Sequence, residues 1–131
     1  MSDPRPVRGV VVGHGDMARG LIDAVRHIAG DMADGLTPLS NEGRGPDQLK
    51  TDLDAAAGLG PAVVFADLQF GSCGIAASYS CRDSARRVVI CGVNLPMLLE
   101  FVLHRDLPLD ELVTRLVETG REAIRPAPSV S

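Results

Sequence analysis

Short apolar runs alternate with amphipathic stretches along this chain, in the manner of strands and helices. Val7–Val12, Ala62–Ala66 and Arg87–Cys91 are mostly apolar and rich in β-branched or small residues, which predicts buried strands. A weaker strand is predicted over Ala33–Leu39. The stretches between and after these runs place apolar residues three and four positions apart, as on one face of a helix. Helices are therefore predicted over Met17–Ala29, Pro46–Ala57, Gly74–Cys81, Leu95–His104 and Leu109–Ala123.

This alternation predicts an α/β fold, in which a parallel sheet lies between two layers of helices. We expect a doubly wound three-layer sandwich of four parallel strands in the order 2-1-3-4, with Glu122–Arg125 as a last, short strand. In that order the first and third strands are neighbours. The loops after Val12 and Ala66 should then face each other at the carboxyl edge of the sheet, where such folds bind ligands.

Composition narrows the class of protein. The 131 residues, 45% of them hydrophobic, fit a single domain over 1–131 with flexible tails at 1–6 and 126–131. A net charge of −4 and an aromatic content of 3% argue against a nucleic-acid partner. The apolar runs are too short to span a membrane, and the N-terminus lacks the apolar core of a signal peptide. Three cysteines without a C-x-x-C motif fit reduced thiols, so we expect a cytoplasmic protein.

The loop at residues 13–16 has the sequence Gly-His-Gly-Asp and leads into the helix predicted from Met17. The flanking glycines expose the ring of His14, and a helix N-terminus favours an anion beside it. Because an imidazole nitrogen is nucleophilic near neutral pH, His14 is a candidate for a phosphohistidine. Two other interpretations stay open: His14 is an exposed turn residue, or Gly13-x-Gly15-x-x-Ala18 is a dinucleotide-binding fingerprint.

A second loop follows the third predicted strand and begins at Asp67. An acid at this position can hold one ring nitrogen of His14 and fix the tautomer of the ring. The N–H groups of Gly71 and Ser72, at the start of the next helix, can form a second anion site. The alternative is that Asp67 caps its loop and Ser72 caps its helix.

The candidate metal ligands are few. His14 and Asp16 form a close pair in the sequence, and Cys73, Cys81 and Cys91 are scattered along it, so neither a metal site nor a cofactor is expected. Cys73 itself is either a thiol of low pKa at a helix start or a small packed side chain.

Three segments together resemble the enzyme IIA component of the mannose family in the phosphoenolpyruvate-dependent sugar phosphotransferase system. Gly13–Gly15 is similar to the family's S/T-H-G, and Asp67–Cys73 to its D-L-F-G-G-S-P. Gly92–Leu98 matches the family's G-V-N-L-P-M-L at every position, and the spacing agrees over about residues 7–125. Within the second motif, Gln69, Phe70 and Cys73 replace the family's aromatic residue, first glycine and proline.

The resemblance implies a phosphocarrier, which is a phosphotransferase with a phosphohistidine intermediate. His14 would accept a phosphoryl group from the phosphocarrier protein HPr and pass it to a IIB domain, which phosphorylates sugar during uptake. Asp67 would orient His14. Gly15, Gly71 and Ser72 would surround the phosphoryl group.

The resemblance also implies an assembly. The parallel sheet would carry one antiparallel edge strand, Glu122–Arg125, exchanged between the two subunits of a homodimer. The membrane would be reached only indirectly, through transporter subunits. Two related functions remain as alternatives: a regulatory protein that signals through the phosphorylation state of His14, and the phosphoryl-donor subunit of a dihydroxyacetone kinase.

Overall fold

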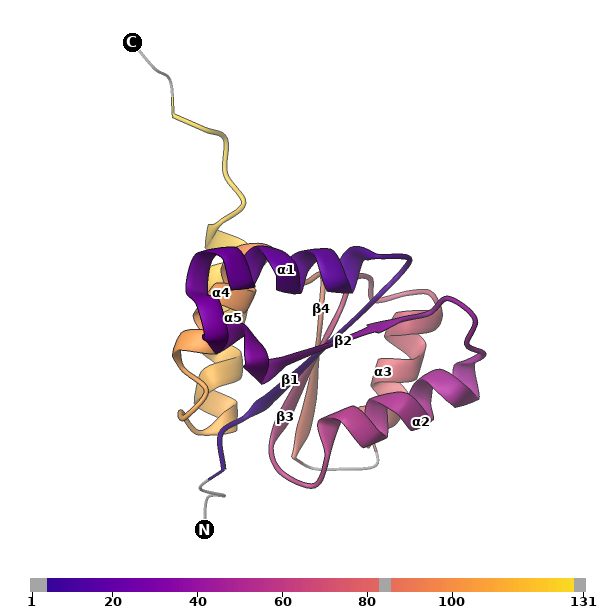
Figure 1. The fold of residues 1–131 in the computed structure, drawn as a ribbon. Coiled ribbons are helices and arrows are strands. Elements are labelled where there is room, and N and C mark those ends of the chain that lie inside the picture. Colours follow the sequence, from indigo (N-terminus) through magenta and orange to yellow (C-terminus); the bar gives the residue numbers. More distant parts are fainter. Residues whose placement is uncertain (1–4, 83–85, 129–131) are drawn as a thin grey trace.

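Residues 5–82 and 86–128, which the computed structural model describes, form a four-stranded parallel sheet covered by helices on both faces (Figure 1). The strand order is β2-β1-β3-β4, which confirms the predicted order. The strands are β1 (Arg8–Gly13), β2 (Leu36–Ser40), β3 (Ala62–Ala66) and β4 (Arg87–Cys91). The helices are α1 (Met17–Ala29), the 3₁₀ helix η1 (Gly30–Gly35), α2 (Pro46–Ala57), α3 (Ser72–Arg82), α4 (Leu95–Leu103) and α5 (Leu109–Glu122). None of the described helices is long and apolar enough to cross a membrane.

The two faces of the sheet bury two separate apolar clusters, because successive side chains of a strand point to opposite faces. On β1, Val11 packs with residues of α1, α4 and α5, whereas Val10 and Val12 pack with residues of α2 and α3. On β3, Phe65 belongs to the first cluster and Val64 to the second. Strands buried on both faces carry apolar residues at every position, and this explains the continuous apolar runs in the sequence.

Two aromatic rings form the centre of the first cluster. Phe65 of β3 and Phe101 of α4 are fully buried, and their rings meet edge to face with centroids 5.2 Å apart. A Cβ at Gly9 of β1 would lie 2.7 Å from both Phe101 and Leu36. A residue without a side chain at position 9 therefore lets α4 pack this closely against the sheet.

The second strand begins later than its pattern predicts. Residues Gly30–Gly35 form η1, and β2 starts only at Leu36. Ala33 is fully buried within η1, and Arg26 of α1 pairs with Asp34 at 2.9 Å. In the sequence, a buried alanine of a short helical turn cannot be distinguished from a buried strand residue. The predicted start of the second strand at Ala33 was therefore wrong.

The C-terminal segment does not form the predicted antiparallel strand. The helix α5 continues to Glu122, and residues 124–128 extend away from the body of the molecule (Figure 1). The N–H of Ile124 still donates to the carbonyl of Arg121, as in a final helical turn. A strand needs a hydrogen-bonded neighbour, and within the described residues Glu122–Arg125 has none. Of the predicted tails, 1–4 and 129–131 lie outside the described residues.

Candidate active site

The loops that follow β1, β2 and β3 meet at the carboxyl edge of the sheet. The strand register pairs Val12 of β1 with Leu39 of β2 on one side and with Ala66 of β3 on the other. The chain therefore leaves all three strands at the same level. His14 and Asp67, which lie 53 positions apart in the sequence, come together there.

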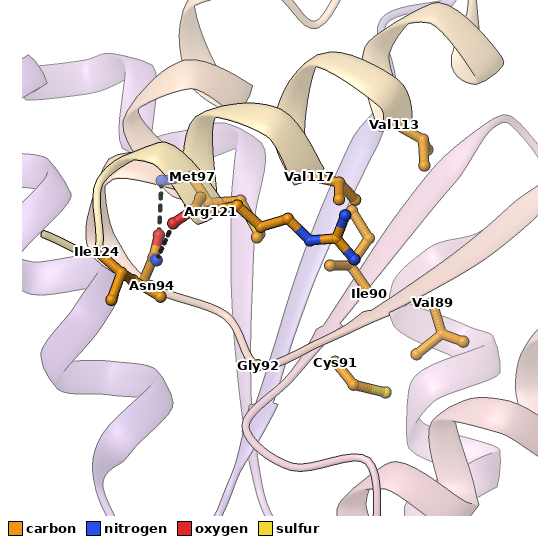
Figure 2. A pocket seen from close by; sticks show the side chains of 11 residues that line it. Val89, Ile90, Cys91, Gly92, Asn94, Met97, Val113, Val117, Arg121 and Ile124 are labelled. Carbon is orange, nitrogen blue, oxygen red and sulfur yellow. Dashed lines mark hydrogen bonds between the residues drawn. The ribbon is translucent and has the colours of Figure 1, made fainter.

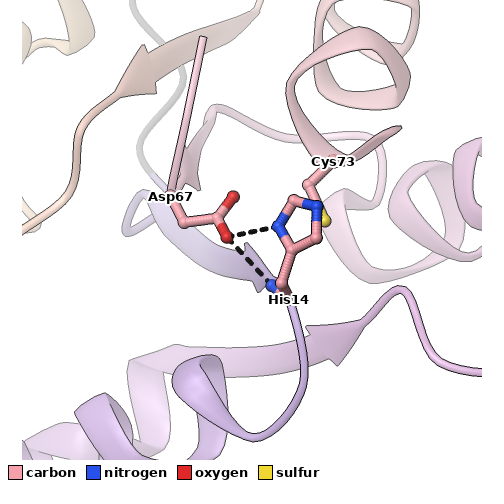
Figure 3. Close-up of side chains that lie close together, drawn as sticks. All are labelled: His14, Asp67 and Cys73. Atoms are coloured by element: carbon pink, nitrogen blue, oxygen red, sulfur yellow. Dashed lines mark hydrogen bonds and ion pairs between the residues drawn. The ribbon is translucent and has the colours of Figure 1, made fainter. Parts of the chain in front are cut away.

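One carboxylate oxygen holds His14 at two points (Figure 3). Oδ2 of Asp67 lies 2.6 Å from Nδ1 of the His14 ring and accepts the backbone N–H of His14 at 2.9 Å. Oδ1 of Asp67 accepts the N–H of Leu68 at 2.9 Å. The N–H of Asp67 donates to the carbonyl of Val12 at 3.2 Å, which ties the pair to the end of β1. The orientation of the ring is thus fixed by the backbone of two strands.

The protonation of this pair follows from its hydrogen bonds. Burial alone would raise the pKa of Asp67, but hydrogen bonds from the His14 ring, the His14 N–H and the Leu68 N–H outweigh it, so the pKa lies below its usual value. Asp67 is therefore ionised at neutral pH. A carboxylate only accepts hydrogen bonds, so Nδ1 of His14 carries the shared proton. The neutral ring then has its free lone pair on Nε2.

The ring edge that carries Nε2 points away from Asp67 (Figure 3). The His14 side chain is 43% exposed. Gly71 lies alongside this edge, because a Cβ at Gly71 would stand 3.6 Å from Cε1 and Nε2 of the ring. Its φ of +99° is also a conformation that side-chain-bearing residues avoid. Phe70 stands at the position of a glycine in the family motif. It is 79% exposed, so its ring is not buried against His14.

Two helices begin beside His14. The helix α1 starts at Met17, and Asp16 makes no side-chain hydrogen bond that would cap it. The helix α3 starts at Ser72, two residues earlier than predicted. Helix N-termini carry free N–H groups and a partial positive charge, which together attract anions. This arrangement brings Gly15, Gly71 and Ser72 to one edge of the sheet, where an anion site stays a prediction.

Asn41, directly after β2, joins the two loops. Its Oδ1 accepts the N–H of Gly15 at 3.3 Å, and its Nδ2 donates to Oγ of Ser72 at 3.5 Å. Asn41 is absent from the predicted site residues. A lone asparagine in a loop has no sequence pattern of its own. The one signal for Asn41 is that it directly follows a strand, at the same sheet edge as His14.

If His14 accepts a phosphoryl group, as the resemblance implies, replacing Asn41 by alanine is expected to slow that step about fivefold, the equivalent of one net hydrogen bond of about 1 kcal/mol. The reason is that the Gly15 loop and the start of α3 lose the side chain that joins them. Single-turnover kinetics with a phosphorylated donor protein would measure the rate. Gln48→Ala, which removes an exposed amide on α2, is the matched control. An unchanged rate in Asn41→Ala would limit Asn41 to a structural role.

The third motif, Gly92–Leu98, holds α4 in place. Oδ1 of Asn94 accepts the N–H of Met97 at 3.1 Å and so caps α4, while its Nδ2 donates to the carbonyl of Gly120 in α5 at 2.9 Å. The N–H of Gly92 donates to the carbonyl of Ala66 at 2.9 Å. The motif therefore connects α4, α5 and the end of β3, directly before Asp67.

Cys73 is a small packed side chain, which is one of its two predicted interpretations. It is fully buried, and both burial and the charge of Asp67 raise the pKa of its thiol, so the low-pKa interpretation was wrong. His14, Asp67 and Cys73 each offer a donor atom within 4.8 Å of the other two (Figure 3). The cysteines are scattered in the sequence, but in space one of them lies beside the candidate nucleophile.

Gly74 packs the start of α3 against the loop that follows Asp67. A Cβ at Gly74 would overlap the backbone carbonyl oxygens of Leu68 and Gln69. We expect Gly74→Ala to destabilise the protein by about 1–3 kcal/mol, because backbone atoms must move to make room. Gly20→Ala is the matched control: it lies in α1, where a Cβ meets nothing, and should stabilise the helix by up to about 1 kcal/mol. Urea unfolding of both variants would decide, and equal stabilities would contradict the packing argument.

Comparison with known proteins gives a consistent result. The family model EIIA-man, described as "PTS system fructose IIA component", matches residues 9–117. The mannose-specific EIIAB component of the phosphotransferase system from Escherichia coli K12 is 48% identical over 52 residues. That match covers 38% of this chain and only 16% of the relative.

Solved structures agree over a longer span. The mannose/sorbose-specific IIA subunit of the phosphotransferase system from Enterococcus faecalis aligns with a TM-score of 0.83 and 26% identity. That alignment covers 97% of this chain and all of the other, at 100%. The phosphotransferase system component EIIA from Streptococcus agalactiae aligns with a TM-score of 0.85 over 92% of this chain and 96% of the other. At 23% identity, this second likeness concerns the fold alone.

Proposed function

Because the chain belongs to the EIIA-man family of phosphotransferase-system IIA components, we propose that it carries a phosphoryl group on Nε2 of His14. The group would come from the phosphocarrier protein HPr and pass to a IIB domain during sugar uptake. The observation that carries this proposal is the hydrogen bond of 2.6 Å between Nδ1 of His14 and Asp67, which leaves Nε2 as the exposed nucleophile.

The transfer step needs little covalent chemistry from the protein. The lone pair of Nε2 attacks the phosphorus atom of the donor phosphohistidine, a bond from phosphorus to Nε2 forms, and the donor's phosphorus–nitrogen bond breaks. The electron pair of that bond returns to the donor's ring. As the His14 ring gains positive charge, the Asp67 carboxylate stabilises it and keeps the proton on Nδ1.

The phosphoryl oxygens would lie between the two helix starts. Backbone N–H groups at Gly71 and Ser72 are the donors we assign to them, with the partial positive charges of the α1 and α3 N-termini. Gly15 lies beside them, and its N–H is already bonded to Oδ1 of Asn41. Positioning and charge account for most of the catalysis of phosphoryl transfer, so a rigid site of this kind suits the reaction.

The exposure of the site favours a protein donor over an enclosed small substrate. Leu68 and Phe70 are exposed apolar side chains on the loop that holds Asp67, and Met17 is exposed at the start of α1. Such side chains next to a half-exposed histidine suit a docked protein surface. The three free thiols fit the reducing cytoplasm, so we place the exchange there, with the membrane reached only through transporter subunits. The comparisons favour neither the regulatory alternative nor the dihydroxyacetone-kinase alternative.

The test is a complete relay with purified components. Phosphoenolpyruvate, enzyme I and HPr should add one acid-labile phosphoryl group to the chain, seen as a shift in intact mass. Adding a mannose-family IIB domain should then remove it. A chain that is phosphorylated but never discharged by any IIB domain would support the regulatory alternative instead.

A homodimer belongs to the same proposal. Within the described residues, the outer edge of β4 pairs with no strand, and a groove of about 310 Å³ runs between this edge and α5 (Figure 2). The groove is largely apolar, with Val89, Ile90, Val113 and Val117 among its lining residues. Ile124 of the same chain, on the segment that leaves α5, also lines the groove, and its side chain is 78% exposed. We assign the groove to the C-terminal segment of a second copy, which would pair with β4.

The dimer depends on residues after α5. A chain ending at Ala123 keeps α5 and the bond from Asn94 to Gly120, so it should fold but become monomeric. The full chain should be dimeric in light scattering at micromolar concentration. Leu59→Asp, at an exposed leucine outside the groove, is the control and should stay dimeric. A monomeric full chain, or a dimer that survives the truncation, would contradict this assignment.

A further inference from the structure

We propose that His14 and Cys73 bind one thiophilic divalent cation of the Zn²⁺ class, and that the bound cation blocks phosphoryl acceptance. Among the described residues, His14, Asp67 and Cys73 are a group in which one donor atom of each lies within 4.8 Å of the other two. Figure 3 shows the Nε2 edge of the His14 ring turned toward the Cys73 side chain. Imidazole nitrogen and thiolate sulfur are the ligands that Zn²⁺ prefers.

The geometry needs only a small contraction. Bonds of about 2.0 Å to nitrogen and about 2.3 Å to sulfur in a tetrahedral site place two ligand atoms about 3.5 Å apart. Because Asp67 holds the ring, donor atoms within 4.8 Å reach that spacing when the start of α3, which carries Cys73, moves about 1 Å toward His14. His14 is half-exposed, so the remaining positions on the cation are open to water.

The hydrogen bond to Asp67 orients the His14 ring for binding a cation as well as for attacking phosphorus. Metal-binding histidines commonly donate their second N–H to a carboxylate, and Nδ1 of His14 lies 2.6 Å from Asp67 in this way. That bond directs the lone pair of Nε2 outward. The charges also balance, since the Asp67 carboxylate and a Cys73 thiolate together neutralise a divalent cation.

Binding would release one proton. The thiol of Cys73 gives its proton to the buffer, and the sulfur lone pair forms the bond to the cation while Nε2 of His14 supplies the second bond. The lone pair of Nε2 that would attack phosphorus then forms the bond to the cation. The cation and the phosphoryl group therefore compete for one atom. This competition rests on the proposed function, whereas the binding site itself does not.

Cys73 makes the inference specific to this chain. The similar family motif has proline where this chain has Cys73, so the sulfur ligand is a departure from that motif. Cys91 lies at the end of the neighbouring strand β4 and is outside the group of three donors. It therefore supplies a matched control for the loss of one thiol.

The binding test uses Co²⁺ as a spectroscopic probe on the reduced full-length protein. The wild type should bind one Co²⁺ per chain with a thiolate-to-cobalt charge-transfer band, and Zn²⁺ should displace it. Cys73→Ala should lose the band and weaken Zn²⁺ binding at least about tenfold, whereas Cys91→Ala should behave as the wild type. A wild type without the band, or a band that survives in Cys73→Ala, would overturn the site.

The competition test measures the initial rate of phosphorylation by phospho-HPr with and without one equivalent of Zn²⁺. The wild type should slow at least about tenfold and recover with a chelator, whereas Cys73→Ala and Cys73→Pro should slow far less under the same conditions. Equal inhibition of all three proteins would overturn the competition. If the cobalt band appears but the chain is never phosphorylated, the proposed function fails and the metal site stands; the reverse result rejects the metal site and keeps the function.

Discussion

Replacing His14 by alanine is expected to abolish phosphorylation of the chain. The alanine side chain has no nitrogen to form the bond to phosphorus, so the loss should be complete. The fold should survive, because His14 is half-exposed and its backbone N–H can still donate to Asp67. Acid-labile phosphate and intact mass, measured after incubation with the complete donor system, would show the result.

The other two histidines provide the controls. His27 lies exposed on α1, with Nδ1 2.9 Å from the carbonyl of Asp23. His104 follows α4, with Nε2 3.4 Å from a carboxylate oxygen of Glu100. Neither lies in the loops at the carboxyl edge of the sheet, so His27→Ala and His104→Ala should keep the full phosphate label. Label that persists in His14→Ala, or disappears in a control, would reject His14 as the acceptor.

Replacing Asp67 by asparagine is expected to slow phosphoryl acceptance by roughly ten- to a thousandfold, the usual effect of removing one preorganised electrostatic partner. The amide keeps the shape of the carboxyl group but not its charge. It therefore neither fixes the proton on Nδ1 nor stabilises the positive charge that the His14 ring gains during transfer. Rapid-quench kinetics with phospho-HPr as the donor would give the rate.

A purely structural role for Asp67 would give a different pattern. If Asp67 only closes its loop, Asp67→Asn should lower thermal stability and leave the transfer rate of the folded protein unchanged. The proton position on the His14 ring, read from nitrogen chemical shifts, separates the two roles. We expect Nδ1–H to predominate in the wild type and to lose its preference in the variant. Asp54→Asn, at a carboxylate bonded to Ser80 and Arg87 away from the site, should not change it.

The sequence predicted those parts of the fold that follow from local periodicity. The bounds of α1, β3 and β4 agree with the pattern, because a buried parallel strand is apolar throughout and a surface helix carries one apolar stripe. The start of β2 was missed because the buried Ala33 belongs to a 3₁₀ turn. The C-terminal strand was expected from Glu122–Arg125, but strand formation depends on a neighbour outside the segment.

The site was predictable to the extent that it depends on topology. The strand order places the loops after β1 and β3 side by side, and these two loops contain His14 and Asp67. Contacts made by single side chains left no trace in the sequence. Asn41 bridges two loops through one amide. Cys73 follows His14 by 59 positions in the sequence, and it comes close to His14 because α3 begins at Ser72, beside the His14 loop.

The position of the phosphoryl group on the His14 ring tests this account most directly. Long-range proton–nitrogen correlation spectra of the protein, phosphorylated by phosphoenolpyruvate, enzyme I and HPr, distinguish the two ring nitrogens. We predict the phosphoryl group on Nε2, with the proton of Nδ1 retained in its hydrogen bond to Asp67. A phosphoryl group on Nδ1 or on another residue, or a chain that accepts no phosphoryl group, would contradict the account.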